Sequence, residues 1–233
     1  MDGQGFTFKQ FDVRQDMCAM KVGTDGVLLG AWAAGGRRIL DVGTGTGLIA
    51  LMMAQRFGDA HVCGIDIDAD ACRQASANVS ESPFASRIEI SHVRLQDFIS
   101  TETFDSIVSN PPFFKDSLKC PDVRRSAARH ADTLSYSDLF RNVSRLLADE
   151  GIFSVVVPTD VDGDFCAEAS IFGLLEIRRS LIKTVPRKSP KRVLLAFAKH
   201  RVGTCGTEEV CLFDEDGNKS EWYRSLTDDF YLK

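Results

Sequence analysis

Residues 104–114 read FDSIVSNPPFF and join a short apolar run to two consecutive prolines. The apolar run, headed by Asp105, is typical of a buried parallel strand. Pro111 and Pro112 end that strand because each lacks the backbone donor that a sheet requires. Each proline also disfavours the helical region for the residue before it, so Asn110 is held extended at the carboxyl end of the strand. Open α/β sheets bind their ligands at this end, and the stretch therefore predicts an α/β fold with a site at Asn110.

The groups at this strand end suit the alkylation of a planar, weakly nucleophilic nitrogen. An adenine amine or a glutamine amide has two N–H donors and a lone pair delocalised into a π system. The side-chain oxygen of Asn110 and the carbonyl of Pro111 can each accept a hydrogen bond from one of these N–H groups. The nitrogen lone pair then faces an electrophile. The nitrogen becomes cationic as the new bond forms, so these acceptors stabilise the transition state more than the ground state. The alternative is a strand that simply ends in a rigid turn.

An aromatic ring completes the predicted catalytic group. Phe113 offers a face on which a base can stack, which is worth about 1–3 kcal/mol in single-stranded nucleic-acid systems. The predicted catalytic residues are Asn110, Pro111, Pro112 and Phe113. Since no strong general base is needed, the remaining requirement is an activated methyl donor.

Composition restricts the class of protein. A chain of 233 residues with a net charge of −5 can form one α/β domain with a sizeable core. We expect residues 1–36 to be an N-terminal segment with the first helix, and residues 202–233 to be an extension packed on the same domain. Seven scattered cysteines without a Cys-x-x-Cys pair favour reduced thiols in a cytoplasmic protein and no metal site. The lack of a signal peptide or a long apolar run predicts no membrane association, and no obligate protein partner is evident.

Residues 38–51, RILDVGTGTGLIAL, predict a strand, a glycine-rich turn and an apolar helix. The pattern D-x-G-x-G-x-G differs from the dinucleotide fingerprint G-x-G-x-x-G, because Leu48 stands where the last glycine would be. Glycines let a ligand approach the backbone and leave the helix N-terminus open. An aspartate before the first glycine suits a cationic ligand, such as the amino group of S-adenosylmethionine. The residues expected to hold the cofactor here are Asp41, Gly43, Thr44, Gly45 and Gly47.

Two later strand ends carry further carboxylates. Asp66 lies about twenty residues past the glycines, where a doubly wound fold holds ribose hydroxyls, and Ile67 is next to it. Asp68 is predicted to cap the following helix. Asp97 could accept a hydrogen bond from an adenine amine, with Phe98 beside the ring. A helix-capping role for Asp97 is the alternative.

A third candidate segment precedes the glycine turn. Residues 20–26 read MKVGTDG and lead into an apolar helix, for which Thr24 is the predicted N-cap. The functional hypothesis places Lys21 and Thr24 over a cofactor or substrate. The alternative is a loop that only enters a helix.

Basic residues gather in two segments of this acidic protein. Residues 115–130 are polar and basic, and residues 178–201 contain nine Lys or Arg and no carboxylate. This asymmetry favours contacts with a phosphate backbone. The predicted RNA contacts are Arg124, Arg125, Arg129, His130, Arg187, Lys188, Lys191 and Arg192. A solvated hairpin without a function is the alternative.

The chain resembles the class I S-adenosylmethionine-dependent methyltransferases. Within them it is similar to the bacterial tRNA(Val) adenine-N6 methyltransferases, which modify adenine 37 of the anticodon loop. The segments that carry the resemblance are residues 20–32, 41–47, 110–113, 128–130 and 190–195. The resemblance implies a Rossmann-like, seven-stranded, mostly parallel sheet with an antiparallel last strand and helices on both faces. It also implies that Asp66, Asp97 and Phe98 hold the donor's nucleoside, and that the target adenine lies against Asn110, Pro111 and Phe113.

The resulting hypothesis is methyl transfer from S-adenosylmethionine to the N6 of an adenine in tRNA, with the anticodon stem-loop as the partner. A loop adenine can be unstacked into a pocket at modest cost. Three alternatives remain open at this point: a protein-glutamine N5 methyltransferase, a guanine-N2 rRNA or adenine-N6 DNA methyltransferase, and a silent RNA-binding adaptor. The basic hairpin disfavours the first, and the complete Asn-Pro-Pro-Phe motif disfavours the last.

Overall fold

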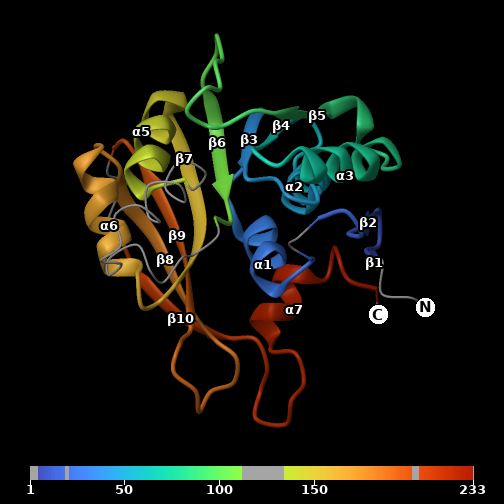
Figure 1. The fold of residues 1–233 in the computed structure, drawn as a ribbon. Helices are drawn as coiled ribbons and strands as arrows, with labels where there is room; N and C mark the ends of the chain where they lie inside the picture. The colour runs from blue at the N-terminus through green and yellow to red at the C-terminus, as the bar shows by residue number, and fades with distance from the viewer. Residues whose placement is uncertain (1–4, 19–20, 112–133, 201–204, 233) are drawn as a thin grey trace, which may run out of the picture.

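The computed structural model describes residues 5–18, 21–111, 134–200 and 205–232 (Figure 1). Its main sheet contains β3 (Arg38–Val42), β4 (His61–Asp66), β5 (Ile88–His92), β6 (Phe104–Ser109), β7 (Leu147–Pro158), β8 (Leu175–Lys183), β9 (Arg192–Ala198) and β10 (Thr207–Cys211). The order of these eight strands across the sheet is β10-β8-β9-β7-β6-β3-β4-β5. The chain thus starts the sheet in its middle, at β3, and extends it in both directions.

Strand direction in this sheet is parallel except around β9. This strand pairs antiparallel with both β7 and β8. The seven strands β3 to β9 confirm the predicted α/β fold with an antiparallel last strand. The eighth strand, β10, was not expected, because the sequence analysis assigned no strand to the C-terminal extension. It pairs parallel with β8 and forms the edge of the sheet.

Helices cover both faces of the sheet. They are α1 (Thr24–Trp32), α2 (Leu48–Arg56), α3 (Ala69–Ser80), α5 (Tyr136–Leu146), α6 (Asp162–Ile171) and α7 (Glu221–Thr227), with a short 3₁₀ turn at Ala85–Arg87. In Figure 1, α5 and α6 lie on one side of the sheet, and α1, α2 and α7 lie on the other. No helix in the described ranges has both the length and the apolar character needed to cross a membrane.

Alternating side chains explain the two hydrophobic cores. Successive residues of a strand point to opposite faces of the sheet, so a strand covered on both faces is apolar throughout. Ile39 and Val108 pack into the core shared with α1 and α2. Their neighbours Leu40 and Ile107 pack into the core shared with α5 and α6. The continuous apolar runs in the sequence therefore correspond to central strands.

The two terminal segments pack against each other. A small hairpin of β1 (Gly5–Thr7) and β2 (Asp12–Arg14) is followed by the loop to α1. The ring of Phe8 lies 6.0 Å from that of Tyr231, and the Lys9 amide donates to the Phe230 carbonyl at 2.8 Å. The extension after residue 205 therefore packs on the rest of the chain, as expected, while the division into a single domain stays a prediction.

The position of β3 determines where a ligand can bind. From β3 the chain adds β4 and β5 on one side, and then returns to add β6 and β7 on the other. Ligands of open α/β sheets bind outside the carboxyl ends of the strands at such a reversal of strand order. The glycine turn follows β3 and Asn110 follows β6, so the fold brings both predicted groups to this point.

Candidate functional site

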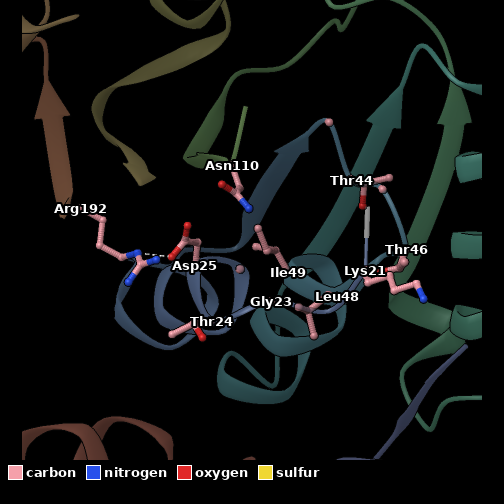
Figure 2. A pocket seen from close by; sticks show the side chains of 13 residues that line it. Lys21, Gly23, Thr24, Asp25, Thr44, Thr46, Leu48, Ile49, Asn110 and Arg192 are labelled. Atoms are coloured by element: carbon pink, nitrogen blue, oxygen red, sulfur yellow. Dashed lines mark ion pairs between the residues drawn. The ribbon is translucent and has the colours of Figure 1, made fainter. Parts of the chain in front are cut away.

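A cavity of about 290 Å³ lies at the carboxyl ends of β3 and β6. This volume is near the lower end of the range of about 300–1,000 Å³ for small-molecule sites. The lining residues are Lys21, Gly23, Thr24, Asp25, Gly26, Gly43, Thr44, Gly45, Thr46, Leu48, Ile49, Asn110 and Arg192. Figure 2 shows Asn110, Asp25 and Arg192 at one side of this cavity and Lys21, Thr44 and Thr46 at the other.

The glycine turn presents bare backbone to the cavity. Gly43, Gly45 and Gly47 have φ angles of 73°, 55° and 80°, which L-residues rarely adopt. A Cβ atom at Gly43 would have no neighbour within 4 Å, so its place is open space at the cavity wall. Gly47 is the N-cap of α2, and this glycine has no side chain that could cap the helix. The turn therefore leaves room for a ligand and leaves backbone donors at the helix N-terminus open.

Asp41 holds this turn in place through hydrogen bonds to its own neighbours in the sequence. Its carboxylate is fully buried, and Oδ2 accepts from Thr44 Oγ1 at 2.7 Å and from the Ala50 amide at 3.1 Å. Oδ1 is buried without a hydrogen-bond partner among the described residues. Burial raises the pKa of Asp41 to about 7, with a smaller contribution from the nearby charge of Asp66. The carboxylate does not line the cavity, so the structure gives it a role in shaping the turn.

Asp66 connects the end of β4 to the glycine turn. Its Oδ2 accepts from the Gly45 amide and its Oδ1 from the Asp68 amide, each at 2.9 Å. The side chain of the next residue, Ile67, is 46% exposed, which is unusual for isoleucine and leaves an apolar face for a ring. Asp68 accepts from the Asp70 amide at 2.8 Å and caps α3, as predicted.

Asp97 and Phe98 lie in a turn between β5 and β6. No helix begins at Asp97, so the alternative that this residue is a helix cap is wrong. The Asp97 carboxylate is exposed, and the Phe98 ring packs 6.2 Å from the ring of Phe104. Neither residue lines the cavity beside Asn110, and their contact with a donor nucleoside stays a prediction.

The segment before α1 forms another wall of the cavity. Lys21 and Thr24 both line it, and their placement over a cofactor or substrate stays a prediction. The N-cap of α1 is Gly23 and not Thr24, so that prediction was wrong. Gly23 has extended backbone and its carbonyl accepts from the Val27 amide at 3.2 Å, which makes Thr24 the first helical residue. This position leaves the Thr24 side chain exposed.

Asn110 faces the cavity, and its side-chain amide has no partner among the described residues. The residue is half-buried, and its side chain makes no hydrogen bond within the described part of the chain. Ser109 Oγ donates to the Val42 carbonyl at 2.9 Å, which fixes the end of β6 against β3. The following Pro111 is buried. Both acceptors predicted for a target amine are therefore held on a rigid strand end. The other two members of the predicted group, Pro112 and Phe113, lie outside the described residues.

Two amides on α3 hold the N-terminal segment against the glycine turn. Asn78 Nδ2 donates to the carbonyls of Arg14 and Thr46 at 2.9 and 2.8 Å, and Asn78 Oδ1 accepts from the Arg14 amide. Gln74 Oε1 accepts from the Met17 amide at 3.0 Å. Both side chains are buried. The sequence analysis missed these residues, since a polar residue on an amphipathic helix gives no signal of its partner.

The basic residues of 178–201 separate into two groups. Five of them face a carboxylate of the same chain: Arg178, Arg179, Lys183, Arg192 and Lys199. Arg187, Lys188 and Lys191 are exposed in the β8–β9 hairpin and make no ion pair with the described residues. The predicted RNA contacts Arg124, Arg125, Arg129 and His130 lie outside those residues. Arg192 differs from the other hairpin cations because it lines the cavity and pairs with Asp25.

Asp25 is a cavity residue that the sequence analysis did not assign. Its motif neighbours Lys21 and Thr24 were assigned, and an aspartate directly after Thr24 was the available signal. Its partner Arg192 is distant in sequence, so only the fold reveals the pair. Burial raises the pKa of Asp25, and the Arg192 guanidinium opposes this effect.

The donor and acceptor groups present fit S-adenosylmethionine. The open N-terminus of α2 and the Lys21 ammonium suit a carboxylate. The bare backbone at Gly43 leaves space for the body of a ligand. Asp66 retains acceptor capacity for hydroxyl groups at the end of β4, and the exposed Ile67 suits a planar ring. Lys21 and Gly43 line the cavity, and Asp66 at the end of β4 contacts the same glycine turn through the Gly45 amide.

Comparisons with known proteins agree with this arrangement. A family model described as "Methyltransferase small domain" matches residues 22–165. A tRNA1(Val) (adenine(37)-N6)-methyltransferase from Phocaeicola vulgatus is 51% identical, with 97% of each chain covered. A protein of the same description from Bacteroides thetaiotaomicron is 49% identical over 97% of each chain. Among solved structures, one described as a predicted O-methyltransferase from Agrobacterium tumefaciens shares the fold, with a TM-score of 0.71, 18% identity and coverage of 88% of this chain and 96% of that one.

Proposed function

This chain belongs to the family of tRNA1(Val) (adenine(37)-N6)-methyltransferases, and on that premise we propose that Asn110 and Pro111 hold the target amine in the cavity at the end of β6. The reaction is S-adenosylmethionine-dependent methyl transfer to the N6 of adenine 37 in tRNA1(Val). The observation that carries the site assignment is the Asn110 amide, which has no hydrogen-bond partner among the described residues and lies at a strand end in the same cavity as the glycine turn.

Asn110 and Pro111 act on the amine by accepting hydrogen bonds from its two N–H groups. The Asn110 side-chain oxygen and the Pro111 carbonyl take one N–H each, so the nitrogen lone pair is directed away from both. As the nitrogen becomes cationic, two oxygen dipoles already aimed at it stabilise the charge without reorganising. Because Ser109 fixes this strand end to β3, the acceptors keep their positions during the reaction.

The donor site lies along the carboxyl ends of β3 and β4. When bound, S-adenosylmethionine supplies an electrophilic methyl group on a sulfonium. In our proposal Lys21 and the N-terminus of α2 bind its carboxylate, and Asp66 accepts from its ribose hydroxyls. Ile67, Asp97 and Phe98 surround its adenine.

The tRNA contacts follow from the location of the β8–β9 hairpin. This hairpin lies at the same end of the sheet as the carboxyl end of β6 (Figure 1). Its free cations Arg187, Lys188 and Lys191 would bind phosphates of the anticodon stem-loop while adenine 37 enters the cavity. Our proposal also includes phosphate contacts from Arg124, Arg125, Arg129 and His130. The proposal includes action in the cytoplasm, as one domain and without an obligate protein partner.

The substitution Asn110→Ala tests the catalytic assignment. It removes an acceptor that matters most in the transition state, so kcat should fall about 100- to 1,000-fold, as for the loss of one oxyanion-hole donor. S-adenosylmethionine affinity, measured by calorimetry, should stay within about threefold. Turnover is measured on purified tRNA with a labelled donor, and the methyl group is mapped by nuclease digestion and mass spectrometry.

Asn142→Ala is a matched control for this test. Asn142 is a buried asparagine that donates to the Asp138 carbonyl inside α5 and does not line the cavity. Asn142→Ala should keep the kcat of the unsubstituted protein, even if the substitution lowers the stability of the fold. Normal turnover of Asn110→Ala would overturn the site assignment, and methylation of protein, DNA or rRNA instead of tRNA would contradict the reaction.

A further inference from the structure

An ion pair between two distant elements forms one wall of the cavity. Asp25 belongs to the first turn of α1, and Arg192 is the first residue of β9. The Arg192 Nε group pairs with Asp25 Oδ1, and both residues line the cavity together with Asn110. The side chains keep 27% and 39% of their surface exposed, so the pair is desolvated on one side and open to the cavity on the other (Figure 2).

This pair lies beside the proposed target amine. A Cβ atom at Gly26, the residue after Asp25, would come within 4.0 Å of Asn110 Nδ2. The first turn of α1 therefore approaches the Asn110 side chain directly. A base held at Asn110 has the Asp25–Arg192 pair next to it on the α1 side.

An adenine in this position needs a hydrogen-bond donor. With its amine at Asn110 and Pro111, the ring nitrogens that flank the amine, N1 and N7, are acceptors only. Lys21 and Arg192 are the cationic side chains that line the cavity among the described residues. Lys21 lies at the side of the glycine turn and Arg192 at the side of Asn110 (Figure 2). Arg192 is therefore the cationic donor that lies on the same side of the cavity as Asn110.

The geometry leaves donors of Arg192 available. Its ion pair uses Nε, and the guanidinium makes no hydrogen bond with the described residues. Arginine presents five N–H donors in a fixed fork, so both Nη groups can still donate. Asp25 fixes the orientation of this fork, and its negative charge keeps the wall neutral, so that a cationic methyl donor is not repelled.

We propose that Arg192 determines specificity by donating a hydrogen bond to a ring nitrogen, N1 or N7, of the target adenine, and that Asp25 is its positioning residue. This inference rests on the proposed function of the cavity. It assigns Arg192 to the base-binding pocket and no longer to the phosphate contacts. A pocket that donates to this nitrogen leaves an Nη donor of Arg192 without its partner when the nitrogen is absent, which is the usual source of strong discrimination.

The test uses synthetic anticodon stem-loops that differ only at position 37. They carry adenine, 1-deazaadenine or 7-deazaadenine, which each lack one candidate acceptor. The unsubstituted protein should lose about 10- to 100-fold in kcat/KM with one of the two analogues, as expected for a hydrogen bond to a charged group. Arg192→Met should have lower activity on adenine and lose no more than about twofold further with the same analogue. This non-additivity separates the hydrogen bond from the altered reactivity of the analogue.

Two further variants give the controls. Lys199→Met removes a cation just after β9 that pairs with Asp149 at 3.3 Å and does not line the cavity, so it should keep the full discrimination. Asp25→Asn should reduce the discrimination between adenine and the analogue, and the unbalanced charge of Arg192 should weaken S-adenosylmethionine binding. A purely structural role of Asp25 would lower stability and leave the discrimination as it was.

The possible outcomes separate this inference from the proposed function. Equal methylation of all three stem-loops by the unsubstituted protein overturns the inference, even if Arg192→Met fails to fold. The same analogue penalty in the unsubstituted protein and in Arg192→Met also overturns it. In both cases methylation of the adenine stem-loop at N6 leaves the proposed function intact. No methylation of any stem-loop, with methylation of another substrate, contradicts the proposed function itself.

Discussion

At the residue scale, the glycine turn contributes to the cavity because its glycines have no side chains to fill it. Gly43 has a left-handed backbone, and the space where its Cβ would lie belongs to the cavity. Gly173, in the turn between α6 and β8, has nearly the same φ, 75° against 73°, and equally open space. It does not line the cavity. The two positions therefore share the backbone requirement and differ only in their relation to the ligand.

The pair of variants Gly43→Ala and Gly173→Ala separates these two effects. Each substitution should lower the free energy of unfolding by about 1–2 kcal/mol, because L-residues are strained in this region. Only Gly43→Ala should weaken S-adenosylmethionine binding, by at least about tenfold, since its methyl group enters the site. Urea unfolding and calorimetric titration measure the two quantities. Equal donor affinity in both variants would contradict the location of the donor site.

At the element scale, the N-terminal segment is attached to the catalytic sheet through α3. Asn78 makes three hydrogen bonds, two to the backbone of Arg14 and one to the carbonyl of Thr46 in the glycine turn. The segment that it holds continues to Lys21, which lines the cavity. A helix side chain thus positions a wall of the donor site without contacting the cavity.

Asn78→Ala should loosen this wall. The Thr46 carbonyl and the Arg14 backbone lose their partners, so the KM for S-adenosylmethionine should rise about tenfold, which corresponds to about 1.4 kcal/mol. The kcat at saturating donor should change less than twofold, because Asn110 is untouched. Steady-state kinetics at varied donor concentration checks this, with Asn142→Ala as the control. A fall in kcat at unchanged KM would disprove the positioning role.

At the scale of the whole molecule, the antiparallel strand β9 brings its first residue to the catalytic end of the sheet. Arg192 pairs in register with Pro158, the last residue of β7. The hairpin before it lies at the same end, and its cations Arg187, Lys188 and Lys191 make no ion pair with the described residues, while their neighbours in the sheet pair with carboxylates. An acidic protein can in this way present a local basic surface beside the cavity.

Neutralising the hairpin should change the salt dependence of tRNA binding. In Arg187→Gln, Lys188→Gln and Lys191→Gln combined, the slope of log K against log salt should decrease in magnitude by about 2, or about 0.7 for each lost phosphate contact in single-stranded RNA. Lys199→Gln is the control and should leave the slope unchanged. Filter binding between about 50 and 200 mM salt measures it. An unchanged slope in the triple variant would remove the hairpin from the tRNA site.

Much of the fold could be predicted from the sequence because the signals are local. The short apolar run in residues 104–109 predicted β6, and Asp68 was correctly assigned as a helix cap. The prediction for Thr24 failed because Gly23 can also be extended and takes the cap position itself. β10 was missed because its five residues carry no continuous apolar run, as expected for a strand at a sheet edge.

The sequence by itself determined the order of strands and helices from α1 to β9 along the chain, the glycine turn, and the Asn-Pro group at the end of β6. These features depend on backbone rules that act between neighbouring residues. Only the tertiary structure decided which polar groups meet: Asp25 with Arg192, Asn78 with Thr46, and Asp41 beneath its own turn. Such contacts are set by strand order and by the reversed direction of β9, and no pattern along the chain encodes a distance across the sheet.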